Sequence, residues 1–151
     1  MFNIVLFQPQ IPPNTGNILR LCANTGCKLH IIEPIGFSID DKSLRRAGLD
    51  HINNIKLTVH ESFNKCIDLL GMNNFFVITK FGKTRYDNAN FNYNDVLLFG
   101  SETSGLPTKI IKSFSQEKTL LIPMKSKSRS LNLSNAVSIV VYEAWKQLNF
   151  N

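Results

Sequence analysis

The sequence predicts an α/β fold, in which a mostly parallel sheet is flanked by helices. Short apolar runs rich in β-branched and aromatic residues alternate with helical patterns along the chain, and this alternation is typical of strand–helix–strand units. The chain has 151 residues, which is room for one such domain and too few for two. We therefore expect residues 1–151 to form a single domain.

Capping residues, glycine and proline predict where the elements begin and end. Asn14 or Thr15 offers a cap to a first helix that ends near Gly26, Gly71 ends a later helix, and Pro107 suits the first position of another. The expected elements, in order, are a strand over 3–7, the first helix, a strand over 28–32, a short basic helix over 42–47 capped by Asp40 or Asp41, a strand over 56–59, a helix over 61–70, a strand over 75–79, an irregular loop over 81–94, a strand over 95–99, a helix over 107–114, a strand over 119–122 and a helix over 133–148.

Composition argues against several classes of protein. Seventeen Lys and Arg against eleven Asp and Glu give a net charge of +6, which favours a polyanionic partner. The three cysteines include no CxxC pair and the three histidines follow no metal-ligand spacing, so we expect neither a disulfide framework nor a metal site. The chain begins without a basic leader, and no apolar run approaches the roughly 20 residues of a membrane span. We expect a cytoplasmic protein that contacts no membrane.

The last helix carries more apolar residues than one sheet face covers. Over 133–148 they form more than one narrow stripe, so a second surface is needed to bury them. We expect a homodimer built on this C-terminal helix; the alternative is a helix buried within the monomer.

Three segments carry groups suited to chemistry. Residues 14–20, NTGNILR, place a glycine between two Asn where a helix is expected to begin, one turn before Arg20, an arrangement that suits a phosphate. Residues 99–107, FGSETSGLP, put two glycines around Glu102 at the end of a strand, where α/β sheets collect ligands. Residues 122–136, IPMKSKSRSLNLSNA, alternate basic and hydroxyl side chains before a helix start, which suits a polyanion.

Together these segments resemble the SPOUT class of S-adenosylmethionine-dependent RNA 2′-O-ribose methyltransferases. The resemblance runs from residue 1 to about 148, and the three segments stand in the family's order and spacing. More narrowly, MFNIVLFQPQIPPNTGNILRLCANTG and DDKSLRRAGLDH resemble the small TrmL type, which methylates cytidine or uridine 34 of tRNA. The resemblance implies an α/β fold with a deep trefoil knot in its C-terminal part, a homodimer, and the tRNA anticodon arm as partner.

The resemblance also implies the roles of particular residues. The cofactor S-adenosylmethionine, which leaves as S-adenosylhomocysteine, would be held by Ile78, Gly100, Glu102, Ile122, Met124, Ser130 and Leu131. The catalytic residues would be Arg20, Asn17, Ser130 and Asn135. The RNA would be contacted by Arg20, Lys125, Lys127, Arg129, Arg45 and Arg46. Ser104 stands where close relatives often carry Arg, and the nearby lysines are expected to supply that charge.

Arg20 is expected to act as a clamp rather than as a base. A guanidinium with a pKa above 12 gives up its proton too reluctantly, so we expect it to hold the neighbouring phosphate and stabilise the developing alkoxide. The proton acceptor is left unassigned. Two other functions remain open at this point, namely ribose methylation at another tRNA or ribosomal RNA site, and an RNA-binding module that keeps the fold without catalysis.

Overall fold

A parallel sheet forms the centre of the protein. The computed structural model describes residues 1–38, 56–126, 128 and 130–151. Within them, seven strands lie in the order β3-β2-β1-β6-β4-β7-β5, and every neighbouring pair is parallel. The strands are β1 (Asn3–Phe7), β2 (Lys28–Ile32), β3 (Leu57–His60), β4 (Phe75–Ile78), β5 (Thr84–Arg85), β6 (Val96–Phe99) and β7 (Thr119–Leu121). The predicted α/β fold class is confirmed.

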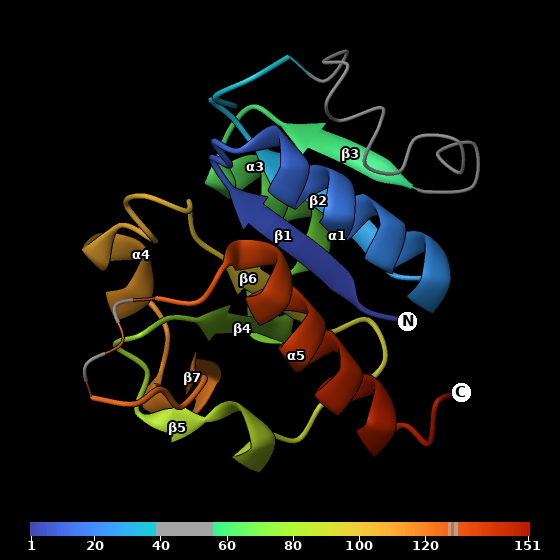
Figure 1. Ribbon diagram of the computed structural model, residues 1–151, viewed down its shortest axis with the longest axis vertical. Coiled ribbons are helices and arrows are strands. Elements are labelled where there is room, and N and C mark those ends of the chain that lie inside the picture. Colours follow the sequence, from blue (N-terminus) through green and yellow to red (C-terminus); the bar gives the residue numbers. More distant parts are fainter. Residues whose placement is uncertain (39–55, 127, 129) are drawn as a thin grey trace.

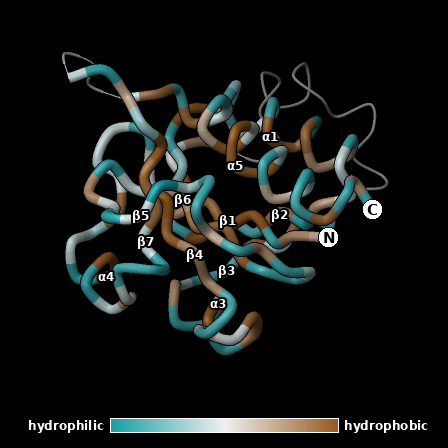
Figure 2. The backbone as a smooth tube through the Cα atoms, turned by 90° about the horizontal axis from the view of Figure 1, so that it is seen from below, coloured by the Kyte–Doolittle hydropathy of each residue, from teal (hydrophilic) through white to brown (hydrophobic). Residues whose placement is uncertain are grey.

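Helices cover both faces of this sheet (Figures 1 and 2). α1 and α5 lie side by side on one face, while α3 and α4 lie on the other. The described helices are α1 (Pro12–Thr25), α3 (Phe63–Leu70), α4 (Thr108–Lys112) and α5 (Leu133–Gln147), with the short 3-10 helices η2 (Met72–Asn74), η3 (Tyr86–Asn88) and η4 (Gln116–Lys118). The molecule therefore has three layers with the sheet in the middle.

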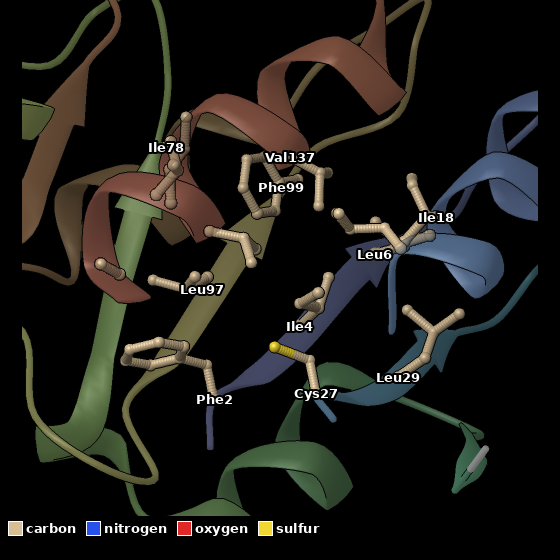
Figure 3. Packing of buried hydrophobic residues seen from close by; sticks show 14 of the residues in the cluster. Phe2, Ile4, Leu6, Ile18, Cys27, Leu29, Ile78, Leu97, Phe99 and Val137 are labelled. Atoms are coloured by element: carbon tan, nitrogen blue, oxygen red, sulfur yellow. The ribbon is translucent and has the colours of Figure 1, made fainter. Parts of the chain in front are cut away.

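Each face of the sheet has its own hydrophobic core. Side chains alternate between the faces along a strand, so Ile4 and Leu6 of β1 pack toward α1 and α5, whereas Val5 and Phe7 pack toward α3. Figure 3 shows the first of these cores, in which Val137 of α5 meets residues of the sheet. Because the central strands are buried on both sides, they are rich in apolar residues, and β1 and β2 lie where the sequence predicts them.

The start of α1 differs from the prediction. The helix begins at Pro12 with Ile11 as its N-cap, and the side chain of Ile11 makes no hydrogen bond to the helix backbone. Asn14 and Thr15 are therefore helical residues rather than caps, and Gly16 lies inside the helix instead of presenting free N–H groups at its start. The prediction that a glycine at the helix start presents free N–H groups is therefore wrong. The predicted end is right, because Gly26 adopts φ +70° there.

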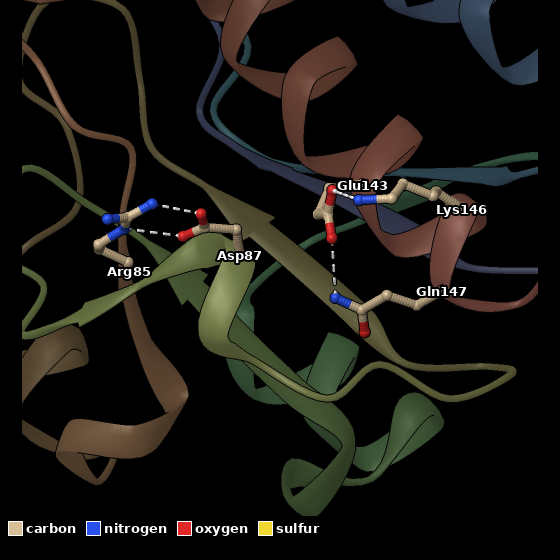
Figure 4. A network of polar contacts seen from close by, with 5 residues as sticks. All are labelled: Arg85, Asp87, Glu143, Lys146 and Gln147. Carbon is tan, nitrogen blue, oxygen red and sulfur yellow. Dashed lines mark hydrogen bonds and ion pairs between the residues drawn. The ribbon is translucent and has the colours of Figure 1, made fainter.

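The segment over 81–94 is more ordered than the predicted irregular loop. It contains β5 and η3, and β5 pairs with β7 at the edge of the sheet. Arg85 and Asp87 form an ion pair, and the N–H of Phe91 donates to Gln147 Oε1 of α5 at 3.1 Å. Gln147 in turn donates to Glu143 on the same helix (Figure 4). Tertiary contacts with β7 and α5 thus order a segment that has no hydrophobic pattern of its own.

Most other predicted elements are confirmed, with small shifts at their ends. α3 starts at Phe63, directly after its N-cap Ser62, and Gly71 is its C-cap. α5 starts after its N-cap Asn132, whose side chain accepts hydrogen bonds from two backbone N–H groups. Pro107 is the N-cap of α4 instead of its first residue. The predicted basic helix over 42–47 lies outside the described residues. The threading of a knot stays a prediction.

The three cysteines are buried and free. Burial raises the pKa of the Cys22 thiol, and it raises that of Cys66 to about 12, so both stay protonated at neutral pH. Among the described residues, no helix is long and apolar enough to cross a membrane, and no group of three or more His, Cys, Asp or Glu side chains is arranged to hold a metal ion.

Candidate active site

A pocket of about 520 Å³ opens where three strands end and α5 begins. This volume is in the range of small-molecule sites, and the carboxyl ends of parallel strands are the usual place for them. The wall formed by Ile78, Phe99 and Leu106 is almost fully buried. The lining residues are Ile11, Asn14, Ile78–Phe81, Phe99–Leu106, Ile122, Met124, Ser130–Leu133 and Ala136.

The loop after β6 contains two glycines and is closed by two backbone hydrogen bonds. The N–H of Ser101 donates to the Gly105 carbonyl at 3.2 Å, and the N–H of Gly105 donates back to Ser101 at 2.9 Å. Gly105 adopts φ +67°, and a Cβ on Gly100 would lie 2.3 Å from the Gly105 carbonyl carbon. Because no side chain fits at Gly100, backbone forms this part of the pocket wall.

Glu102, at the tip of this loop, ties β6 to the start of α1. Its Oε2 accepts from the N–H of Gln10 at 2.8 Å, and its Oε1 accepts from the N–H of Ile11 at 3.1 Å and from Asn14 Nδ2 at 3.1 Å. The carboxylate thus holds the two residues that lead into α1, and its charge suits the positive end of the helix. The first two helical residues are prolines and carry no N–H group, so α1 begins without a side-chain bond from its N-cap residue.

A chain of amide contacts extends this link to α5. Asn14 Oδ1 accepts from Asn132 Nδ2 at 2.9 Å. Asn132 Oδ1 accepts from the N–H of Ser134 at 2.9 Å and from its hydroxyl at 2.6 Å. The carboxylate loop, the start of α1 and the Ser/Asn-rich start of α5 are therefore joined in one network beside the pocket. Residues of both the segment over 99–107 and the segment over 122–136 line this one pocket.

The residues predicted to hold the cofactor come together here, and those predicted for catalysis come together only in part. Ile78, Gly100, Glu102, Ile122, Met124, Ser130 and Leu131 all line the pocket. Of the predicted catalytic residues, only Ser130 lines it; Asn135 is exposed on the first turn of α5, and Asn17 and Arg20 are exposed on α1. Lys125 is exposed on the loop that precedes α5. Lys127, Arg129, Arg45 and Arg46 lie outside the described residues.

Several residues of the site were not predicted from the sequence. Asn132 and Asn14 carry the link between α1 and α5, and Thr79, Lys80 and Phe81 form the rim beyond β4. Asn132 carries a usable signal, because an Asn directly before an apolar helical pattern is a typical N-cap. The rim residues carry none, because they follow a buried strand without any special pattern.

A buried histidine pair lies apart from the pocket, between β2 and β3. His30 Nδ1 and His60 Nε2 are 2.9 Å apart, and both side chains are buried. Burial, followed by the neighbouring His60, lowers the pKa of His30 to about 4. The pair is therefore neutral at physiological pH, and it serves packing and hydrogen bonding between the strands.

The family of this chain follows from comparison with known proteins. Residues 1–142 match the model of the SpoU rRNA Methylase family. The chain belongs to the SpoU methylase family. A curated relative of Escherichia coli strain K12, tRNA (cytidine(34)-2'-O)-methyltransferase, is 51% identical over 150 residues, which cover 99% of this chain and 96% of the relative.

Solved structures of RNA-methylation proteins share the fold. A structure described as giving insights into the 2-OH methylation of C/U34 on tRNA superposes with a TM-score of 0.92 at 40% identity, covering 100% of this chain and 98% of that chain. The SpoU methyltransferase AviRb of Streptomyces viridochromogenes, in complex with the cofactor AdoMet, has a TM-score of 0.86 at 22% identity and covers 97% of this chain and 57% of its own. At that identity the second likeness concerns the fold alone.

Proposed function

We propose that this chain transfers the methyl group of S-adenosylmethionine to the ribose 2′-hydroxyl of nucleotide 34, a cytidine or uridine, in tRNA. The observation that carries the proposal is the similarity to the Escherichia coli tRNA (cytidine(34)-2'-O)-methyltransferase, which spans nearly the whole length of both chains. The likeness to the structure concerned with C/U34 methylation supports the same substrate.

The pocket fits S-adenosylmethionine. Its volume of about 520 Å³ is adequate, and the apolar side chains of Ile78, Ile122 and Leu131 suit the two faces of an adenine ring. Backbone at Gly100 and polar groups at Glu102 and Ser130 are available for the polar parts of the molecule, with Met124 beside them. When bound, the cofactor supplies a methyl group already activated by a sulfonium. S-adenosylhomocysteine is then the product that leaves.

The protein's own contribution is to position the ribose. In our proposal Ser130 at the pocket and Asn135 on the first turn of α5 orient the ribose, together with Asn17 on α1. Arg20, on the same exposed face of α1 as Asn17, holds the phosphate next to the 2′-oxygen, and its fixed positive charge favours the developing alkoxide. Arg20 does not accept the proton, since a guanidinium stays charged.

Basic residues outside the pocket hold the anticodon arm in this proposal. The net charge of +6 and the exposure of Lys125 next to the pocket support an anionic partner on this side. RNA phosphates are expected to meet Lys125, Lys127, Arg129, Arg45 and Arg46.

A homodimer through α5, acting in the cytoplasm, completes the proposal. α5 buries Val137, Val140 and Val141 against the sheet and α1, yet it leaves Ile139 36% and Tyr142 47% exposed. These side chains form a second apolar stripe that a copy of the same helix would cover. Equilibrium sedimentation tests this directly, and a monomer at micromolar concentration would contradict it.

Methyl transfer by a matched pair of variants tests the proposed function. Arg20→Ala is expected to lower turnover on tRNA by at least 100-fold while the affinity for S-adenosylhomocysteine, measured by calorimetry, stays within threefold. Lys65→Ala, which removes an exposed charge from α3 on the opposite face of the sheet, serves as the control and keeps full turnover. Equal loss of turnover and cofactor affinity in Arg20→Ala would contradict the proposed role of Arg20 in holding the phosphate.

A further inference from the structure

Phe81 is an exposed aromatic side chain at the rim of the pocket. With 64% of its surface accessible, it is the most exposed large hydrophobic residue in the part of the chain that the structure describes. Leu69 on α3 is similarly exposed, at 63%, but only Phe81 lines the pocket. Single exposed apolar side chains are common on proteins, so its position and its surroundings have to carry the argument.

The backbone around Phe81 is held in place. The N–H of Thr79 donates to the Leu120 carbonyl of β7 at 2.9 Å, and the N–H of Gly82 donates to the Thr79 carbonyl at 3.1 Å. The N–H of Phe81 donates to Thr79 Oγ1 at 3.3 Å. A Cβ on Gly82 would lie 2.5 Å from the Leu120 carbonyl carbon, so the turn is pressed against β7. A fixed turn thus presents a solvent-facing ring, which lowers the entropy cost of binding a partner.

The positively charged side chain of Lys80 lies beside the Phe81 ring. Lys80 Nζ lies 5.2 Å from the centroid of Phe81, and Lys80 is exposed and also lines the pocket. An exposed aromatic ring beside a flexible positive charge is the combination that binds single-stranded nucleic acid, because the ring stacks on a base while the charge meets a phosphate.

We propose that Phe81 is a positioning residue that stacks on the base of the nucleotide being methylated, with Lys80 on an adjacent phosphate. The inference rests on the proposed function and deepens it. Phe81 follows Ile78 of the pocket wall by three residues, a reach of at most about 10 Å, so a base on the ring keeps its own ribose near the pocket. Stacking recognises the flat face of a base and not the hydrogen-bonding groups on its edge, so it accommodates cytidine and uridine alike.

An RNA base fits this ring better than the adenine of the cofactor does. In the proposed function the adenine already has apolar partners in Ile78, Ile122 and Leu131, all of which line the pocket. Phe81, in contrast, stands mostly in solvent, where a ligand that arrives from outside can cover it.

The first test compares Phe81→Ala with Leu69→Ala, which removes an equally exposed side chain away from the pocket. On an anticodon stem-loop RNA, Phe81→Ala is expected to lose about 10- to 100-fold in kcat/KM, Phe81→Tyr to stay within threefold, and Leu69→Ala to match the unaltered protein. Melting temperature and the affinity for S-adenosylhomocysteine should be unchanged in all three. A Phe81→Ala variant as active as Leu69→Ala, or one that loses cofactor affinity in parallel, overturns the proposal.

A stem-loop RNA with an abasic nucleotide 34 tests whether Phe81 stacks on the base of that nucleotide. It keeps the 2′-hydroxyl but offers nothing to stack, so the unaltered protein and Phe81→Ala should methylate it with equal kcat/KM. If Phe81→Ala loses a further tenfold on the abasic RNA, the ring does not stack on that base and the inference fails. Failure of the proposed function looks different, because the unaltered protein would then methylate neither RNA at nucleotide 34.

Discussion

Replacing Glu102 with Gln removes the charge that joins the carboxylate loop to α1. In the structure one carboxylate accepts three hydrogen bonds, from the backbone N–H groups of Gln10 and Ile11 and from Asn14. A Gln side chain keeps one acceptor oxygen, which can serve Ile11 and Asn14. Its amide group then faces the N–H of Gln10, donor against donor, so that contact is lost.

The size of this effect follows from the number and kind of bonds. A hydrogen bond to a charged group contributes about 1.5–3 kcal/mol. One such bond is lost and two are weakened, while water can replace part of the loss because the carboxylate is only half-buried. We therefore expect Glu102→Gln to lower the free energy of unfolding by about 2 kcal/mol, which corresponds to a fall in melting temperature of roughly 4–8 °C for a chain of this length.

Thermal unfolding followed by circular dichroism measures this effect. Glu61→Gln changes an exposed carboxylate and should leave the melting temperature within about 1–2 °C. The double variant with Asn14→Ala should show a coupling energy above about 0.5 kcal/mol, because the two side chains share a hydrogen bond. Equal melting temperatures for Glu102→Gln and Glu61→Gln, or strict additivity with Asn14→Ala, would refute the assigned role of Glu102.

Three further predictions concern the pocket, the histidine pair and the RNA-facing surface. Gly100→Ala should lower the affinity for S-adenosylhomocysteine at least tenfold in calorimetry, because its Cβ would lie 2.3 Å from the Gly105 carbonyl carbon; unchanged affinity would contradict this. As pH falls below about 6.5 the unfolded chain protonates His30, whereas the folded chain does so only near pH 4, so urea unfolding should show stability lost between these values, by at most about 3 kcal/mol. His30→Gln should flatten that dependence, and an equally steep profile in the variant would assign the loss to other groups. Lys125→Ala should weaken tRNA binding and reduce the slope of log K against log salt by about 1; an unchanged slope would remove Lys125 from the RNA contacts.

The two asparagines of the network show what local sequence can and cannot predict. Asn132 stands directly before an apolar helical pattern, and it caps α5 as local rules predict. Asn14 has similar neighbours, yet α1 starts two residues earlier, at Pro12. The side chain of Asn14 donates instead to Glu102, which lies 88 residues away in the chain. Pro12 and Pro13 are the local signal for the earlier start, because proline favours the first turn of a helix, whereas no local pattern reveals the contact with Glu102.

Strand pairing is a second feature of the fold that the sequence predicts only in part. The buried strands β1 and β2 could be predicted to the residue because apolar residues predominate in both. β5 could not, since Thr84 and Arg85 form a strand only through their pairing with β7. The contact between His30 and His60 depends in the same way on the register of β2 against β3. Sequence periodicity predicts that a strand exists and which way its side chains alternate, but not which residue lies opposite which.

Mapping the methyl group tests the central claim most directly. The purified protein, tRNA that lacks modification at nucleotide 34, and S-adenosylmethionine carrying an isotopically labelled methyl group are incubated together, and the tRNA is digested for nucleoside and fragment mass spectrometry. Our account predicts labelled 2′-O-methylcytidine or 2′-O-methyluridine in the anticodon fragment at nucleotide 34, formed at least 100-fold more slowly with Arg20→Ala. Label on a base, label at another nucleotide, or no transfer at all would contradict it.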